Sequence, residues 1–181
     1  TMDMFGTKLG YAEYCAIPDD GLRHEVIDGM HFMNPGPYSR HQLTQARLLS
    51  KLVATIDDAR RGTVYAAPID VQLSAHDIVQ PDIVVVLDAN EQIVTETHIV
   101  GAPDLVVEIL SKSTRRHDRE RKFALYERSG IREYWIVDTD ARVIDQFVLV
   151  NGSYELRAQS GASLQLAILP DVTIELARVW E

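Results

Sequence analysis

Hydrophobic positions spaced three and four residues apart predict a long helix over residues 39–58. These positions are Leu43, Ala46, Leu49, Leu52, Val53 and Ile56. The segment "SRHQ", which starts at Ser39, has the spacing of a capping box. A second helix is predicted over residues 115–129, because Gly130 follows it and glycine commonly ends helices.

Short apolar runs predict strands on either side of the second helix. Three lie before it, over residues 63–74 with a break at Pro68, 82–87 and 105–110, and one follows it over 133–138. The runs "DIVVVL" and "DLVVEIL" are apolar on both faces, as is usual for strands that are covered on both sides. The last two strands and the helix between them form a strand–helix–strand crossover, for which a right-handed connection is expected.

Two further turns predict hairpins near the ends of the chain. Asp28-Gly29 and Asn151-Gly152 each separate two short strand-like runs. We therefore predict an α/β fold with a mixed β-sheet flanked by helices, and with added N- and C-terminal β-hairpins. No repeat or linker rich in glycine, proline or serine divides the sequence, so one domain over residues 1–181 is the simplest interpretation.

Composition narrows the classes of protein. The 181 residues are 46% hydrophobic and 25% charged, which is ordinary for a globular domain with a sizeable core. No apolar run approaches the roughly 18 residues of a membrane span, and we see no secretory signal, so we expect a cytoplasmic protein without a membrane partner. Cys15 is the only cysteine, which excludes an internal disulfide and a cysteine-based zinc site. No glycine-rich phosphate loop and no GxSxG motif is present, which argues against nucleotide-triphosphate and serine hydrolysis.

Charge is distributed unevenly along the chain. The net charge of −9 argues against a protein that coats nucleic acid non-specifically. Residues 111–122 nevertheless hold six basic and two acidic side chains, a local net charge of +4. This segment is either a basic rim that contacts phosphates or a solvated helix face with intrahelical ion pairs.

A single carboxylate interrupts the apolar run 105–110. Glu108 shares a strand face with Val106 and Leu110. Burying an unpaired carboxylate costs several kcal/mol, so Glu108 must have a partner or a chemical task. A structural ion pair with an arginine of the next helix is the alternative to a functional role.

Two Pro-Asp pairs, which contribute Asp82 and Asp104, precede apolar runs. Asp104 lies ~13 Å from Glu108 along one strand, too far to share a metal ion, and a strand-capping role suits it. If the two strands pair antiparallel, Asp82 falls opposite position 108 or 110 on the same face as Glu108. Two such carboxylates suit Mg²⁺ or Mn²⁺. For Asp82, too, capping is the alternative.

The chain resembles the PD-(D/E)xK nuclease superfamily and, more narrowly, the Uma-two family. The matching segments are "RHEVIDGMHFMNPGPYSRHQ", "VQPDIVVVLD" and "GAPDLVVEILSKSTRRHDRERKFALYERSGIREYWIVD", which together span most of residues 23–138. The order helix–strand–strand–strand–helix–strand matches as well. The resemblance implies a metal-dependent nuclease fold in which Asp82 and Glu108 bind the ion, and it suggests a homodimer.

One position departs from the superfamily pattern. The motif places a lysine two residues after the glutamate, where this chain has Leu110. Lys112 has the same strand parity but follows the predicted end of the strand. Lys122 lies four residues after Asp118 on one helical stripe. Asp118, Lys122 and Tyr126 match a family motif, and this resemblance implies a lysine relocated to the helix. A surface ion pair between Asp118 and Lys122 is the alternative.

Two more residues, Glu25 and His41, match family positions. The match implies that Glu25 is a further ligand or contacts a metal-bound water. It implies that His41, in the first turn of a helix, meets a phosphate or another site residue. Structural roles for both residues remain open.

The sequence therefore predicts a Mg²⁺- or Mn²⁺-dependent endonuclease that acts on DNA. Asp82 and Glu108 hold the ion, and Lys122 offsets charge in the transition state or orients the metal-bound water. Three arginines contact the flanking phosphates. Those arginines are Arg115, Arg116 and Arg119. The main alternative is a non-cleaving binding or dimerisation module. A metal-free acid–base hydrolase is disfavoured, because a chain with 7% aromatic residues shows no sugar-binding platform.

Overall fold

A six-stranded mixed sheet forms the centre of the computed structural model, which describes residues 6–111 and 115–181. Its strands, in spatial order, are β11 (Ser153–Ser160), β10 (Val143–Val150), β9 (Glu133–Asp138), β8 (Leu105–Ile109), β6 (Ile83–Leu87) and β3 (Gly62–Ala66). Strands β8 and β9 are parallel and the other neighbours are antiparallel. The predicted mixed sheet and the C-terminal hairpin are therefore confirmed.

The N-terminal hairpin belongs to a second sheet and does not extend the first. This sheet has the order β2 (Met30–Asn34), β1 (Arg23–Ile27), β5 (Asp77–Val79), β4 (Val71–Ser74) and β7 (Ile99–Val100). The strand predicted over residues 63–74 is divided at the predicted break, and its halves are β3 in one sheet and β4 in the other. Pro68 lies between them and has no N–H to donate to a ladder.

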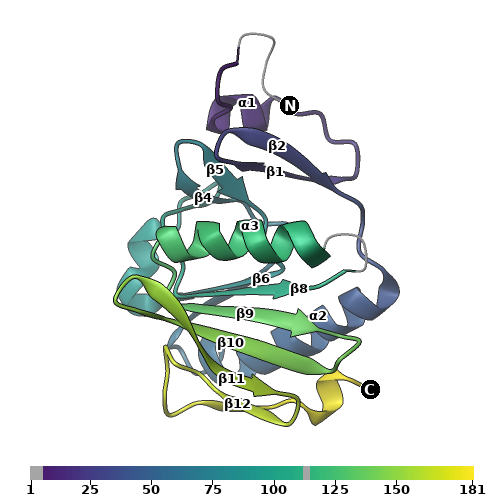
Figure 1. Cartoon of the computed structure of the whole chain (residues 1–181). Helices are drawn as coiled ribbons and strands as arrows, with labels where there is room; N and C mark the ends of the chain where they lie inside the picture. The colour runs from purple at the N-terminus through teal and green to yellow at the C-terminus, as the bar shows by residue number, and fades with distance from the viewer. Residues whose placement is uncertain (1–5, 112–114) are drawn as a thin grey trace.

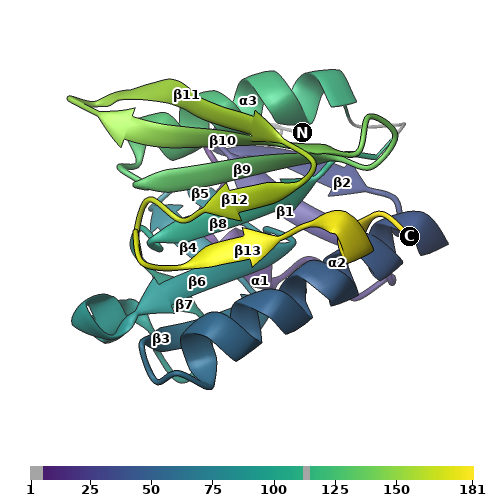
Figure 2. The ribbon, with the colours of Figure 1, turned by 90° about the horizontal axis from the view of Figure 1, so that it is seen from below.

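Two long helices cover opposite faces of the six-stranded sheet (Figures 1 and 2). Helix α2 (Ser39–Leu52) continues as a π-helical turn (Val53–Asp57), and together they cover residues 39–57 of the predicted range 39–58. Helix α3 (Arg115–Arg128) matches the second prediction. The predicted capping box at Ser39 does not form, because the N-cap is Tyr38 and makes no side-chain cap hydrogen bond. Within the two described ranges, no helix is long and apolar enough to cross a membrane.

Short elements complete the fold. They are helix α1 (Tyr11–Cys15), two 3-10 turns (Asp88–Ile93 and Ala177–Val179), and the two-stranded sheet of β12 (Ser163–Gln165) and β13 (Thr173–Glu175). None of them was predicted, because each is too short to show a hydrophobic period.

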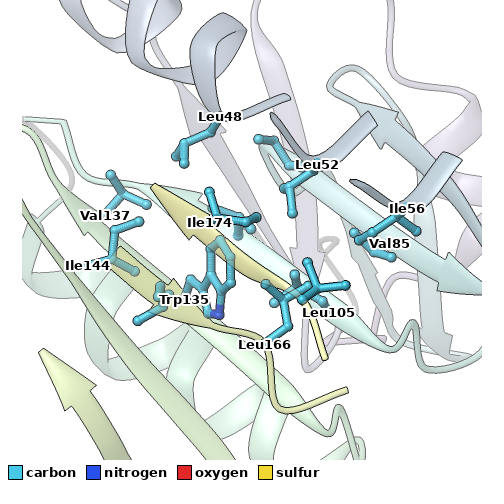
Figure 3. Close-up of a cluster of buried hydrophobic side chains, with 14 of the residues drawn as sticks. Leu48, Leu52, Ile56, Val85, Leu105, Trp135, Val137, Ile144, Leu166 and Ile174 are labelled. Carbon is cyan, nitrogen blue, oxygen red and sulfur yellow. The ribbon is translucent and has the colours of Figure 1, made fainter. Parts of the chain in front are cut away.

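One hydrophobic core lies between the six-stranded sheet, α2 and the C-terminal segment (Figure 3). Its labelled members are Leu48, Leu52, Ile56, Val85, Leu105, Trp135, Val137, Ile144, Leu166 and Ile174. Burying a side chain of this size contributes roughly 1.5–3 kcal/mol. Packing on this face therefore holds β6 and β8 rigidly, and so fixes the positions of the side chains on their opposite face.

The opposite face of β6 and β8 packs against α3 and the second sheet. Val84, Val106 and Leu110 are buried there together with Tyr126 of α3. Glu108 lies on this face, between Val106 and Leu110 in strand alternation, as predicted. Both faces of these strands are thus covered, and one carboxylate is inserted into the second core.

Candidate functional site

The register of β6 and β8 makes Asp82 and Glu108 neighbours. The strands are antiparallel, with Ile83 opposite Val107 and Val84 opposite Val106. Extending this register by one residue places Asp82 opposite Glu108, so both side chains project from one face. The two carboxylates line a small cavity of about 30 Å³. The sequence prediction that Asp82 falls opposite position 108 or 110 is confirmed, at position 108.

The carboxylate of Asp82 accepts two hydrogen bonds, contacts His41 and is almost completely buried. Its Oδ1 accepts a hydrogen bond from the Arg23 guanidinium at 2.8 Å, and its Oδ2 accepts one from the backbone N–H of Ile109 at 2.7 Å. The Nε2 atom of His41 lies 3.3 Å from Oδ2. Burial alone would raise the pKa of Asp82, but His41 and the charge of Arg23 outweigh it and lower this pKa to about 2. Asp82 is therefore ionised at physiological pH.

Among the described residues, the partners of Glu108 all contact one of its two carboxylate oxygens. Its Oε1 accepts hydrogen bonds from Lys122 Nζ at 2.9 Å and from the Tyr126 hydroxyl at 2.6 Å. Its Oε2 makes no hydrogen bond with any residue of the described ranges. Burial raises the pKa of Glu108 to about 7; the Lys122 ammonium opposes this rise, and the carboxylates of Asp82 and Glu25 add to it. Glu108 is thus close to gaining or losing its proton at neutral pH.

Helix α3 contributes Lys122 and Tyr126 from successive turns of the face that packs on the sheet. Lys122 is only 2% exposed, and its Nζ also contacts Oε1 of Glu25 at 3.0 Å. The same oxygen of Glu25 accepts a hydrogen bond from the backbone N–H of Gln80 at 2.9 Å. A buried ammonium needs charged or polar partners, and the two glutamates provide them. Because Lys122 is buried, the alternative of an ion pair on the protein surface does not describe its environment. The side chain of Asp118 lies outside the described atoms.

Burial also raises the pKa of Tyr126 well above 10, and the charge of Glu108 adds to this rise. The Tyr126 hydroxyl therefore stays protonated and donates to Glu108. The four groups Glu25, Lys122, Glu108 and Tyr126 form one buried hydrogen-bonded network between β1, α3 and β8.

Two buried nitrogen atoms at the site have no hydrogen-bond partner among the described residues. Arg23 Nε and His41 Nδ1 make no hydrogen bond with the part of the chain that the structure describes. An unsatisfied buried polar atom costs about 1–3 kcal/mol, so its presence favours a site whose occupant completes the bonding. Sequence reasoning missed Arg23. Its strand parity, the same as that of Glu25, is the signal that could have found it.

Two arginines of the predicted basic rim have acidic neighbours within the protein. Arg116 is exposed and lies 3.8 Å from Glu120, while Arg119 donates to Asp145 of β10 at 2.6 Å. The side chain of Arg115 lies outside the described atoms, and Lys112 lies outside the described residues. The intrahelical alternative thus fits Arg116, and phosphate binding by these arginines stays a prediction.

Asp104 caps the start of its strand, as the sequence predicted for a carboxylate too far from Glu108 to share a metal ion. Its Oδ2 accepts a hydrogen bond from the backbone N–H of Leu87 at 2.8 Å, and its Oδ1 accepts one from Arg132 at 2.9 Å. These bonds join the end of β6 to the start of β8 and to the segment before β9. Asp104 is therefore a natural comparison for Asp82, since both follow a proline and begin an apolar run.

The donor set fits a weakly held Mg²⁺ or Mn²⁺ better than a tightly coordinated metal. Among the described residues, no three His, Cys, Asp or Glu side chains gather in a way that could hold an ion. Two carboxylates, one of them with an oxygen that has no hydrogen bond from a described residue, match sites where water supplies the remaining ligands.

Comparison with known proteins extends these observations. The family Uma2, described as "Putative restriction endonuclease", matches residues 11–177. An uncharacterized protein of Synechocystis sp. is 28% identical over 127 residues, which cover 69% of this chain and 65% of that protein. The match thus spans less than two thirds of the length of that relative.

A solved structure is similar over almost its whole length. It is a crystal structure from Anabaena variabilis of a protein described as a "putative nuclease belonging to DUF820". The TM-score is 0.78 with 17% sequence identity, and the match covers 95% of this chain and 97% of that one. At this identity the likeness establishes the fold, and the predicted restriction-endonuclease-like α/β core is confirmed.

Proposed function

Since this chain belongs to the Uma2 family of restriction-endonuclease-like proteins, we propose that it is an endonuclease that hydrolyses DNA phosphodiester bonds with Mg²⁺ or Mn²⁺. The observation that carries the proposal is the pairing of Asp82 with Glu108 on one buried strand face, with Lys122 in contact with Glu108. The family supplies the class of reaction, and these three side chains supply a place for it.

Asp82 and Glu108 are the residues that would hold the ion. Asp82 offers a charge that persists at physiological pH, and Glu108 offers Oε2, which has no partner among the described residues. A carboxylate oxygen has two lone pairs, so Asp82 Oδ1 can keep Arg23 and still accept a second partner. When bound, the ion supplies a Lewis acid and an acidified water.

Lys122 takes the part that the superfamily assigns to a strand lysine. The strand position of that lysine is occupied by Leu110, which is buried. Lys122 instead reaches Glu108 from α3. Glu25 and Glu108 fix its ammonium from opposite elements, and Gln80 fixes Glu25. A cation positioned in this way stabilises negative charge that develops on a phosphoryl oxygen, because no reorganisation is needed during the reaction.

His41 and Arg23 orient Asp82. Arg23 is anchored a second time, through a hydrogen bond to the backbone carbonyl of Gln80. Its guanidinium therefore holds Asp82 from the second sheet while His41 contacts it from the start of α2. A carboxylate held from both sides has a fixed geometry for a ligand.

The same contacts favour one alternative, a non-cleaving module that acts in nucleic-acid binding or dimerisation. Each carboxylate already has a cationic partner in the protein, Arg23 for Asp82 and Lys122 for Glu108. In this alternative the ion pairs are the final state of the site, and no metal enters. A homodimer would suit either function, because cleavage of both strands of a duplex needs two sites.

Metal binding distinguishes the two functions. We expect calorimetry to show weak Mn²⁺ binding by the wild type and at least roughly tenfold weaker binding by Asp82→Asn, because one of two charged ligands is lost. The same preparations are tested for DNA cleavage with Mn²⁺ and with EDTA, and cleavage should require both Mn²⁺ and Asp82.

The control is Asp104→Asn, which changes the other Pro-Asp carboxylate and should leave Mn²⁺ binding at the wild-type level. Thermal melts establish that each variant is folded. Equal Mn²⁺ binding by the wild type and Asp82→Asn would remove Asp82 from the metal site. No Mn²⁺ binding by the wild type, together with no cleavage of any DNA, would support the non-cleaving alternative.

A further inference from the structure

A larger cavity adjoins the carboxylate pair. Its volume is about 410 Å³, and its lining residues are Tyr38, Arg40, His41, Leu110, Ser111, Thr139 and Asp140. It shares His41 and Ser111 with the small cavity that contains Asp82 and Glu108. The lining of the larger cavity comes from the segments that follow β8 and β9 and from the start of α2, and these strand ends lie at the right of Figure 1. The carboxyl ends of parallel strands are a common place for ligands in α/β proteins.

We propose that this cavity holds one unpaired nucleotide of a single-stranded DNA substrate, with its base stacked on Tyr38 and a neighbouring phosphate at the carboxylate pair. The proposal rests on the proposed nuclease function, since it names the form of DNA that this site accepts.

The depth of the carboxylates favours a single strand over a duplex. Asp82 is 1% exposed and Glu108 is 7% exposed, and the space before them is about 30 Å³, enough for one or two water-sized groups. In a duplex the bases are stacked inside, so a base can enter a protein cavity only after it is flipped out at a cost of a few kcal/mol. An unpaired nucleotide enters without that cost. A volume of 410 Å³ lies in the range of small-ligand sites.

Tyr38 provides the stacking surface. Tyr38 is 68% exposed, although it is a large aromatic residue. It is the N-cap of α2 and lines the cavity. Stacking of a base on an aromatic side chain contributes about 1–3 kcal/mol and does not depend on the base sequence. Leu110 adds an apolar part to the lining, which suits the face of a base.

Arg40 provides a cation for the adjacent phosphate. Its guanidinium lies 3.1 Å from Asp140, another lining residue, and both side chains are about half exposed. An exposed ion pair of this kind contributes about 0–1 kcal/mol, so a phosphate can replace Asp140 at little cost. Arg40 follows Tyr38 by two residues, so base and phosphate contacts can come from one short segment.

The charge of the protein agrees with this choice. A duplex is bound mainly by neutralising many phosphates, and this chain has a net charge of −9. Two arginines of α3 that could bind phosphates already have acidic neighbours. Arg116 lies 3.8 Å from Glu120, and Arg119 pairs with Asp145 at 2.6 Å. Stacking supplies affinity that does not need a large basic surface.

Fluorescence anisotropy in EDTA tests the proposal, because no cleavage occurs and no metal is needed. The probes are a short thymidine oligonucleotide, the same chain with every base removed, and a hairpin duplex. Tyr38→Ala should weaken binding of the thymidine oligonucleotide roughly tenfold and leave binding of the base-free chain unchanged. Tyr38→Phe should bind like the wild type, as should Leu156→Ala, which shortens an exposed apolar side chain on β11.

The proposal is overturned if Tyr38→Ala binds the thymidine oligonucleotide as tightly as the wild type does. It is also overturned if Tyr38→Ala weakens binding of the base-free chain by the same factor, or if the wild type binds the duplex as tightly as the single strand. These outcomes are separate from those of the nuclease proposal. Tyr38-dependent binding without Mn²⁺ cleavage keeps the nucleotide cavity and removes the nuclease. Cleavage of duplex and single strands at equal rates, unchanged in Tyr38→Ala, keeps the nuclease and removes the cavity.

Discussion

Replacing Lys122 with methionine should slow Mn²⁺-dependent DNA cleavage roughly a hundredfold, which corresponds to about 3 kcal/mol of lost transition-state stabilisation. Methionine keeps most of the volume of the side chain and removes its charge. The ammonium is held 2.9 Å from Glu108 and 3.0 Å from Glu25, so it is positioned before the substrate arrives. Single-turnover cleavage of one oligonucleotide by wild type and variant measures the effect.

The Lys122→Met protein should also be less stable, because the buried carboxylates of Glu25 and Glu108 lose the ammonium that lies between them. Cleavage is therefore compared at a temperature at which melting curves show both proteins folded. Lys112→Met is the matched control and should cost much less. If Lys112→Met loses activity while Lys122→Met retains it, the lysine that acts in catalysis has been assigned to the wrong residue.

Glu108→Gln should remove a pH dependence of stability from the metal-free protein. The pKa of Glu108 is about 7 in the folded chain against an ordinary 4.5, so folding favours the protonated form. The stability due to this group is fully present below pH 4.5 and is lost as the pH rises through about 7. The difference between the two pKa values corresponds to about 3 kcal/mol.

Urea unfolding in EDTA at pH 4.5 and pH 8 measures this effect on wild type and Glu108→Gln. The stability of the wild type relative to the variant should fall by up to about 3 kcal/mol between these pH values. Added Mn²⁺ should restore part of it at pH 8, because the ion binds the ionised carboxylate. A relative stability that is the same at both pH values would show that Glu108 is not perturbed by its burial.

The position of the carboxylate pair could be predicted because it depends on strand parity. Asp82 and Glu108 each occupy a known place in a short apolar run, and antiparallel pairing leaves few registers. The contact of Lys122 with Glu108 required more, since parity cannot place a helix over a strand. Only the resemblance of the motif Asp118, Lys122 and Tyr126 suggested it.

Arg23 shows where the sequence was insufficient. Its contact with Asp82 spans 59 positions and depends on how the second sheet packs on the first. That sheet itself was not predicted, because β5 has three residues and β7 has two, below the length at which alternation is visible. Local pattern therefore predicted the central sheet and its helices, whereas contacts between sheets came only from the structure.

Anomalous X-ray scattering from a crystal soaked in Mn²⁺ tests the central claim most directly. We predict one strong peak at coordination distance, about 2 Å, from both the Asp82 and the Glu108 carboxylates, with water as the remaining ligands. The peak should be absent from crystals of Asp82→Asn. Cleavage of DNA with Mn²⁺ by a protein whose peak lies elsewhere would contradict this account. So would a soaked crystal with no peak at the site, in which Asp82 and Glu108 keep their ion pairs with Arg23 and Lys122.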